Sequence, residues 1–132
     1  MKNKILTTVC ALGVLVGAGS ASAGTAKISY AKTLPSLTMN VTLGTDTKSN
    51  NSKAKVVNSV VGSTYKTNMW HAMGGRAETK VSPTATGVTD NDTRNFTIDQ
   101  SAVGRTIGLV AENAAWTSVT VEIAGAWYPD TK

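Results

Sequence analysis

Side chains that could do chemistry are scarce in this sequence. Among its 132 residues there is one histidine, His71, and one cysteine, Cys10. A Ser-His-Asp triad would have to use His71, yet the sequence contains no G-x-S-x-G nucleophile elbow. A zinc site needs several ligands from Cys, His and carboxylate groups, which this composition excludes. Because His71 lies between Trp70 and Ala72 in a predicted strand, we expect it to be a packed or edge residue of a sheet.

Two glutamates, Glu112 and Glu122, are the candidates for a hydrolase, since glycoside hydrolysis needs two carboxylates across a cleft. Both fall within predicted strands, and among eight acidic residues two lie near each other often by chance. The segment Met73-Gly74-Gly75-Arg76 is too short for a phosphate-binding loop and precedes no predicted helix. We therefore expect both glutamates to be solvated strand residues and the protein not to be an enzyme.

Asp90, Asp92, Asn95 and Asp99 form the one cluster of hard oxygen ligands in the sequence. Calcium takes roughly six to eight such oxygens, and a loop between strands can supply them. The EF-hand spacing fails, because Arg94 occupies the fifth position of the loop and no glycine follows. Asp and Asn also favour turns for conformational reasons alone. These four residues are therefore weak calcium candidates, and we expect the protein to need no metal or other cofactor.

The first 23 residues have the three regions of a secretory signal peptide. Met1–Lys4 carries two lysines, Ile5–Val16 is an apolar run, and Gly17–Ala23 consists of small residues ending in Ala21-Ser22-Ala23. The apolar run of about 12 residues is too short to span a bilayer, which needs roughly 20. We predict cleavage after Ala23 and release of a secreted, extracellular protein, with no transmembrane segment in the mature chain.

Residues 24–132 form one small domain by length and contain no cysteine, since Cys10 belongs to the signal peptide. Eleven bases against eight acids give them a formal net charge of +3. The charge is uneven, because residues 24–76 carry +6 and residues 77–132 carry −3. This polarity could orient the protein on an anionic cell-wall or membrane surface, unless strands from both halves interleave and scatter the charges. Nucleic acid is not an expected partner, because no basic run with interleaved aromatic residues occurs.

Apolar and polar residues alternate with a period of two in several segments, which is the pattern of half-buried strands. Leu37, Met39, Val41 and Leu43 alternate with polar residues, and Thr25–Lys32 alternates in the same way. Because Thr33–Ser36 is a short connection, these two segments are predicted to form a hairpin. In Thr117–Tyr128 one face is expected to line the core, and it consists of Val119, Val121, Ile123, Gly125 and Trp127.

Further strands are predicted at Lys53–Val61, Ser63–Met73, Arg76–Ser82, Asn95–Ile98 and Thr106–Glu112. Pro83–Thr93 is predicted as a long loop, and no segment outside the signal peptide shows the period of a helix. Several short strands at regular spacing, separated by turn signals, are typical of an antiparallel sandwich. The sequence therefore predicts an all-β fold, a single antiparallel β-sandwich of about seven or eight short strands, preceded by a cleaved signal peptide.

Two segments of the C-terminal third read Leu109-Val110-Ala111-Glu112-Asn113 and Val119-Thr120-Val121-Glu122-Ile123-Ala124-Gly125-Ala126-Trp127. They resemble the ending of small exported β-rich proteins of Gram-positive bacteria, in which a strand L-x-A-E-N precedes a closing strand V-x-G-x-W and an acidic tail. Here the tail is Pro129-Asp130. A more distant similarity links the chain to lactococcin-like bacteriocins, which are also exported, poor in cysteine and rich in β-structure. The resemblance implies export and a β fold, and it supplies no site residues.

The expected function follows from the export signal and from the absence of catalytic groups in the sequence. We expect a secreted, non-catalytic β-sandwich protein that acts at or outside the cell envelope as a binding or interaction module. The alternative is a bacteriocin-like secreted antimicrobial protein, favoured by the small size, the positive mature charge and the lactococcin-like similarity. Growth inhibition of related strains by the purified protein would support that alternative.

Overall fold

The structure is a computed structural model that describes residues 25–132, and the predicted signal peptide, residues 1–23, lies outside them. The described part contains eight strands and one short 3₁₀ turn, η3 (Gln100–Ala102). The strands are β1 (Ile28–Leu34), β2 (Asn40–Thr47), β3 (Ala54–Val61), β4 (Thr67–Met73), β5 (Ala85–Val88), β6 (Asp92–Phe96), β7 (Thr106–Asn113) and β8 (Val121–Tyr128). No helix of residues 25–132 is long and apolar enough to cross a membrane.

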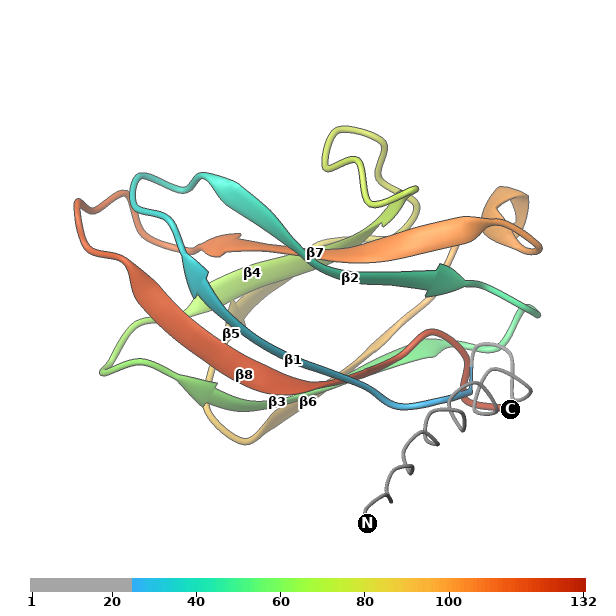
Figure 1. Cartoon of the computed structure of the whole chain (residues 1–132), viewed down its shortest axis with the longest axis horizontal. Helices are drawn as coiled ribbons and strands as arrows, with labels where there is room; N and C mark the ends of the chain where they lie inside the picture. Colours follow the sequence, from blue (N-terminus) through green and yellow to red (C-terminus); the bar gives the residue numbers. More distant parts are fainter. Residues whose placement is uncertain (1–24) are drawn as a thin grey trace, which may run out of the picture.

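The strands form two four-stranded sheets that pack against each other (Figure 1). One sheet has the order β1-β8-β3-β6 and the other the order β2-β7-β4-β5, and all neighbouring strands are antiparallel. The first and last strands pair along their length, from Ile28 opposite Trp127 to Leu34 opposite Val121. The prediction of an all-β sandwich of two antiparallel sheets is therefore confirmed, with eight strands in the described residues.

Three predictions about local structure are wrong. The segments on either side of residues 33–36 do not form a hairpin, because β1 pairs with β8 while β2 pairs with β7 in the other sheet. The turn between them carries the chain from one sheet to the other. Arg76–Ser82 is not a strand but a series of turns, with one isolated bridge between Ala72 and Lys80. Pro83–Thr93 is not a loop throughout, because it contains β5 and the start of β6.

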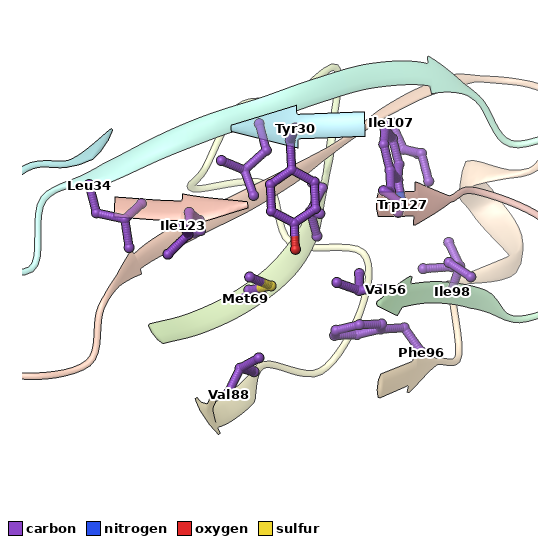
Figure 2. Packing of buried hydrophobic residues seen from close by; sticks show 14 of the residues in the cluster. Tyr30, Leu34, Val56, Met69, Val88, Phe96, Ile98, Ile107, Ile123 and Trp127 are labelled. Carbon is purple, nitrogen blue, oxygen red and sulfur yellow. The ribbon is translucent and has the colours of Figure 1, made fainter. Parts of the chain in front are cut away.

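The main core lies between the two sheets, where apolar side chains from both sheets point inward (Figure 2). In β8 the alternation predicted from the sequence holds, since Val121, Ile123 and Trp127 are buried and Glu122 is exposed. The other large core residues include Tyr30, Leu34, Val56, Met69, Phe96, Ile107 and Leu109. Because residues 24–132 contain no cysteine, burial of these side chains must stabilise the domain without a disulfide.

Gly125, two residues before Trp127, is required by the close packing of neighbouring strands. A Cβ atom on Gly125 would collide with the backbone carbonyl of Val57 and would come within 2.6 Å of Tyr30 Oη. The missing side chain leaves room for a buried hydrogen bond, in which Tyr30 Oη donates to Asn58 Oδ1 at 2.8 Å. Burial raises the pKa of the Tyr30 phenol, so the hydroxyl keeps the proton that it donates.

A second apolar cluster lies on the outer face of the sheet β2-β7-β4-β5 and consists of Trp70, Ala72 and Val110. Ala77 packs against this cluster, and Trp70 Nε1 donates to the Ala77 carbonyl at 3.0 Å. Lys80 Nζ lies 4.5 Å from the centre of the Trp70 ring. Ala77 and Lys80 therefore cover Trp70 on the outer face of β4. The backbone of the segment bonds to the edge of β4 only locally, where Met73 N–H donates to Thr79 O and Val81 N–H donates to His71 O, so it does not form the predicted strand.

Candidate functional site

The large apolar side chains that are exposed in residues 25–132 gather toward one end of the sandwich. Leu37 and Met39 lie between β1 and β2, and Trp116 and Val119 lie between β7 and β8. Trp116 is 75% exposed and Met39 is 60% exposed, while Val60 is exposed near the same end of β3. Figure 1 shows both loops projecting beyond the strands, at the end away from the C-terminus. We call Leu37, Met39, Trp116 and Val119 the apolar end.

The two loops of the apolar end are joined by a backbone hydrogen bond, in which Leu37 N–H donates to Thr117 O at 2.8 Å. Leu37 and Thr38 have φ angles of 61° and 58°, and Met39 N–H donates to Ser36 O at 3.3 Å across them. Two consecutive positive φ angles favour Asn-Gly, and a β-branched residue rarely adopts one. The chain therefore holds Leu37 and Met39 toward solvent in a conformation that costs about 1–3 kcal/mol per strained residue.

The loop between β7 and β8 is held by Asn113, a buried residue at the end of β7. Asn113 Oδ1 accepts from Ala115 N–H at 3.0 Å, and Asn113 Nδ2 donates to Val119 O at 3.3 Å. These bonds fix the loop on both sides of Trp116. Trp116 is therefore exposed on an anchored loop, and its indole stays in solvent without a cover among the described residues.

The sequence predictions for the apolar end are wrong in an informative way. The period-two alternation predicts that Leu37, Met39 and Val119 are buried, and the structure shows all three exposed. Each precedes the first residue of its strand, so the alternation continues into a loop that has no opposite sheet to cover it. Trp116 was not predicted as a site residue. Its one sequence signal is that it is an aromatic residue between the two predicted strands Thr106–Glu112 and Thr117–Tyr128.

The four calcium candidates are not brought together. Asp92 is engaged by Arg94, whose Nε donates to Asp92 Oδ1 at 2.9 Å, and this hydrogen bond lowers the pKa of the Asp92 carboxyl. Asp90 Oδ1 accepts the last backbone N–H of β3 at 2.5 Å. Asn95 lies in β6, and Asp99 precedes η3. Within residues 25–132, no three His, Cys, Asp or Glu side chains gather as a metal site would require.

The two candidate hydrolase carboxylates lie on opposite outer faces of the sandwich. The residues on either side of Glu112 in β7 are buried, so Glu112 points outward, and it accepts from Asn68 Nδ2 at 3.1 Å. The residues on either side of Glu122 in β8 are also buried, so Glu122 points outward from the other sheet. Because the two sheets separate them, Glu112 and Glu122 cannot flank one cleft as the hydrolase mechanism requires.

His71 lies in the core with both ring nitrogens facing polar partners. His71 Nε2 accepts from Trp127 Nε1 at 2.9 Å, and His71 Nδ1 lies 3.4 Å from Ser82 Oγ. The ring packs edge-on against Phe96, with 4.6 Å between ring centres. Because Nε2 is the acceptor, the neutral ring carries its proton on Nδ1. Burial, with a smaller contribution from the positive charge of Lys48, lowers the pKa of His71 to about 3.

We expect mild acid to destabilise the protein through His71. Its pKa is about 3 in the folded state and 6.5 when unperturbed, so the unfolded chain binds the extra proton between these values. The free energy of unfolding therefore falls as the pH drops below 6.5, by about 1.4 kcal/mol per pH unit once the unfolded histidine is protonated. Denaturant unfolding at pH 6.5 and pH 4.5 should show a loss of about 2 kcal/mol.

His71→Gln is the control for this acid effect, because glutamine can accept from Trp127 Nε1 and does not titrate. We expect the variant to lose much less stability than the parent over the same pH range. The range lies above the pH at which Asp92, whose pKa is lowered, takes up a proton. Equal losses in the two proteins would assign the acid sensitivity to other groups.

Lys48 and Asp130 form a buried ion pair at the end opposite the apolar end, and both side chains are fully buried. Lys48 Nζ also donates to Ser52 O at 2.5 Å, and Asp130 Oδ2 accepts from Ser49 N–H at 2.7 Å. The pair fastens the C-terminal tail to the loop between β2 and β3. Sequence reasoning missed it, because 82 residues separate the partners and no local pattern links them.

The basic residues of the N-terminal half do not share one face. Lys32 lies toward the apolar end of β1, while Lys53 and Lys55 lie toward the opposite end, at the start of β3. Strands from both halves interleave, since β8 lies between β1 and β3. The uneven charge of the sequence therefore spreads over several parts of the sandwich.

Comparison of the chain with protein-family models, with curated proteins and with solved structures gives no match. Within residues 25–132 the apolar end departs most from what folding alone requires, because it combines exposed apolar side chains with a strained turn.

Proposed function

We propose that this protein is secreted and acts without catalysis as a binding module at the cell envelope, attaching to the membrane surface through its apolar end. The observation that carries the proposal is the gathering of four large apolar side chains in two joined loops. Contiguous exposed apolar side chains mark interaction sites, whereas single exposed ones are ordinary. The signal-peptide pattern of residues 1–23 supports a location outside the cell.

A lipid surface suits the shape and composition of the apolar end. The loops project from the end of the sandwich (Figure 1), so their side chains can enter the headgroup region while the sheets stay in water. Trp is enriched at membrane–water interfaces, which suits the exposed Trp116. Burying each large apolar side chain contributes about 1.5–3 kcal/mol. The formal charge of +3 on residues 24–132 favours anionic headgroups.

Two measurements test this proposal. The full chain is expressed in a host that exports proteins, and the protein released into the medium is then tested for binding to lipid vesicles. The vesicles contain phosphatidylglycerol and phosphatidylcholine and enclose a dye. Because Trp70 and Trp127 are buried, a blue shift of the tryptophan fluorescence on adding vesicles reports on Trp116. We expect cosedimentation and a blue shift with the dye retained. Dye release together with growth inhibition would favour the bacteriocin-like alternative, and no binding, or no release into the medium, contradicts the proposal.

The most informative variant replaces Leu37 with Asn and Thr38 with Gly. Asn-Gly suits two successive positive φ angles, so we expect the variant to be more stable than the parent by about 1 kcal/mol. It should bind vesicles about tenfold more weakly, because the exposed leucine is lost. A gain in stability with a loss of binding cannot arise from misfolding.

Ser63→Gly is the matched control for the turn variant. Ser63 also has a positive φ, of 56°, but it is polar and lies in the loop between β3 and β4. The control should gain stability and bind vesicles like the parent. Unchanged vesicle binding by the Leu37→Asn, Thr38→Gly variant, or an equal loss in the Ser63→Gly control, would reject the assigned role of the apolar end.

A further inference from the structure

The end of the sandwich opposite the apolar end has a hollow of about 700 Å³ that is lined by lysine, asparagine, serine and threonine residues. The loop between β2 and β3, the start of β3, strand β6 and the C-terminal tail form its walls. None of its lining residues has a carboxylate side chain, and they are Asn50, Asn51, Ser52, Lys53, Lys55, Asn95, Thr131 and Lys132. We call it the lysine–amide hollow.

Within residues 25–132, no ion pair neutralises Lys53 and Lys55 of the lysine–amide hollow. The acid that follows β8 in the chain, Asp130, is buried in its pair with Lys48 and is not available to them. Lys55 Nζ lies 4.8 Å from the centre of the Tyr128 ring, on the outer face of the sheet. Both ammonium groups can therefore meet an external anion.

The walls of the hollow are fixed before any ligand binds. Thr131 N–H donates to Ser52 Oγ at 3.0 Å, and Thr131 Oγ1 donates to Lys53 O at 3.0 Å. Asn50 Nδ2 donates to Lys132 O at 2.8 Å, and the Lys48–Asp130 pair anchors the same tail below the surface. Because these bonds already order the loop and the tail, a ligand would have little backbone to order on binding.

The side chains that remain free are hydrogen-bond donors suited to an anion. The amides of Asn51 and Asn95 form no hydrogen bond within the described residues, so their NH₂ groups can donate alongside the two lysines. Lys55 lies over the ring of Tyr128, so this ring offers no open face on which a neutral sugar could stack. Two lysines at the surface bind one phosphate group weakly, whereas a polymer presents repeated charges to the same site.

We propose that the lysine–amide hollow binds a soluble polyanion with repeated phosphate-type charges. The C-terminal tail, which lines the site, lies at the end of the sandwich away from the two loops of the apolar end (Figure 1). Both surfaces can therefore be occupied at once. The protein would then connect a polyanion to the surface on which its apolar end rests. The proposal does not depend on membrane attachment and has a separate readout.

Titration of the released protein with long-chain sodium polyphosphate tests the hollow. The test variant carries Lys53→Glu and Lys55→Glu, and the control carries Lys32→Glu and Lys66→Glu, two exposed lysines elsewhere with the same change in net charge. We expect the test variant to bind about tenfold more weakly and the control to stay within about twofold of the parent. Binding to the parent should weaken as the salt concentration rises, and both variants should unfold like the parent.

Competing probes distinguish the sources of the phosphate group. Inorganic phosphate should displace polyphosphate only at far higher concentration, because it lacks repeated charges. If both lysine variants lose the same polyphosphate affinity, binding depends on net charge alone, and the assignment of the site to the hollow is wrong. If the protein binds phosphatidylglycerol vesicles through Lys53 and Lys55 but does not bind polyphosphate, the ligand is a lipid headgroup and the proposal of a soluble polymer is wrong. The Leu37→Asn, Thr38→Gly variant should keep its polyphosphate affinity, so the hollow and the apolar end can fail independently.

Discussion

Replacing Trp127 with Ala is expected to lower the free energy of unfolding by about 3–5 kcal/mol. Trp127 is 1% exposed and lies between the sheets (Figure 2). Its Nε1 donates to His71 Nε2 at 2.9 Å. The alanine would remove the largest fully buried side chain of the described residues. A domain of this size has a total stability of about 5–15 kcal/mol, and no disulfide limits the loss. If the total stability lies at the low end of that range, the variant is close to unfolding at room temperature.

Denaturant unfolding of three variants beside the parent checks this expectation. Glu122→Ala lies on the same strand but faces solvent, so it should stay within about 0.5 kcal/mol of the parent. Trp127→Phe keeps an aromatic ring but leaves His71 Nε2 without its donor, which should cost about 1–3 kcal/mol. A Trp127→Ala variant that unfolds like the parent would show that β8 does not pack against the core in this register.

The closing strand could be predicted from the sequence because one of its faces is buried and the other is not. For this reason apolar and polar residues alternate with a period of two in residues 121–128. The structure confirms the predicted burial of Val121, Ile123 and Trp127. The same alternation does not state where a strand begins. For this reason the alternation predicts that the buried face of β2 already includes Leu37 and Met39. In the structure β2 begins at Asn40, and both residues lie in a solvent-exposed turn.

Pairing partners were harder to predict than strands, because alternation contains no information about which strand lies alongside. A short connection such as residues 33–36 is typical of a hairpin, yet here it crosses between sheets. The Lys48–Asp130 pair also depends on the complete fold, since it closes only when the tail after β8 meets the loop after β2. The lysine–amide hollow is built on that same contact, so neither had a local signal.

Replacing Asp130 with Asn is expected to destabilise the protein by about 3–5 kcal/mol, because it leaves the buried Lys48 ammonium without a counter-charge. Asparagine has nearly the same size, and its one amide oxygen can accept from Ser49 N–H or from Lys48 Nζ but not from both, as the two carboxylate oxygens do. The loss therefore reports mainly on charge and not on packing. Asp99→Asn, an exposed aspartate before η3, is the control and should stay within about 0.5 kcal/mol of the parent.

A double-mutant cycle with Lys48→Met shows whether the pair acts as a unit. In the protein with Lys48→Met and Asp130→Asn no charge remains buried at this position, so we expect it to be more stable than Asp130→Asn alone. Denaturant unfolding of the parent, both single variants and the double variant at neutral pH gives the coupling free energy. If the losses of the two single variants simply add, the ammonium of Lys48 reaches water without Asp130. The tail would then be held by its hydrogen bonds to Asn50, Ser52 and Lys53.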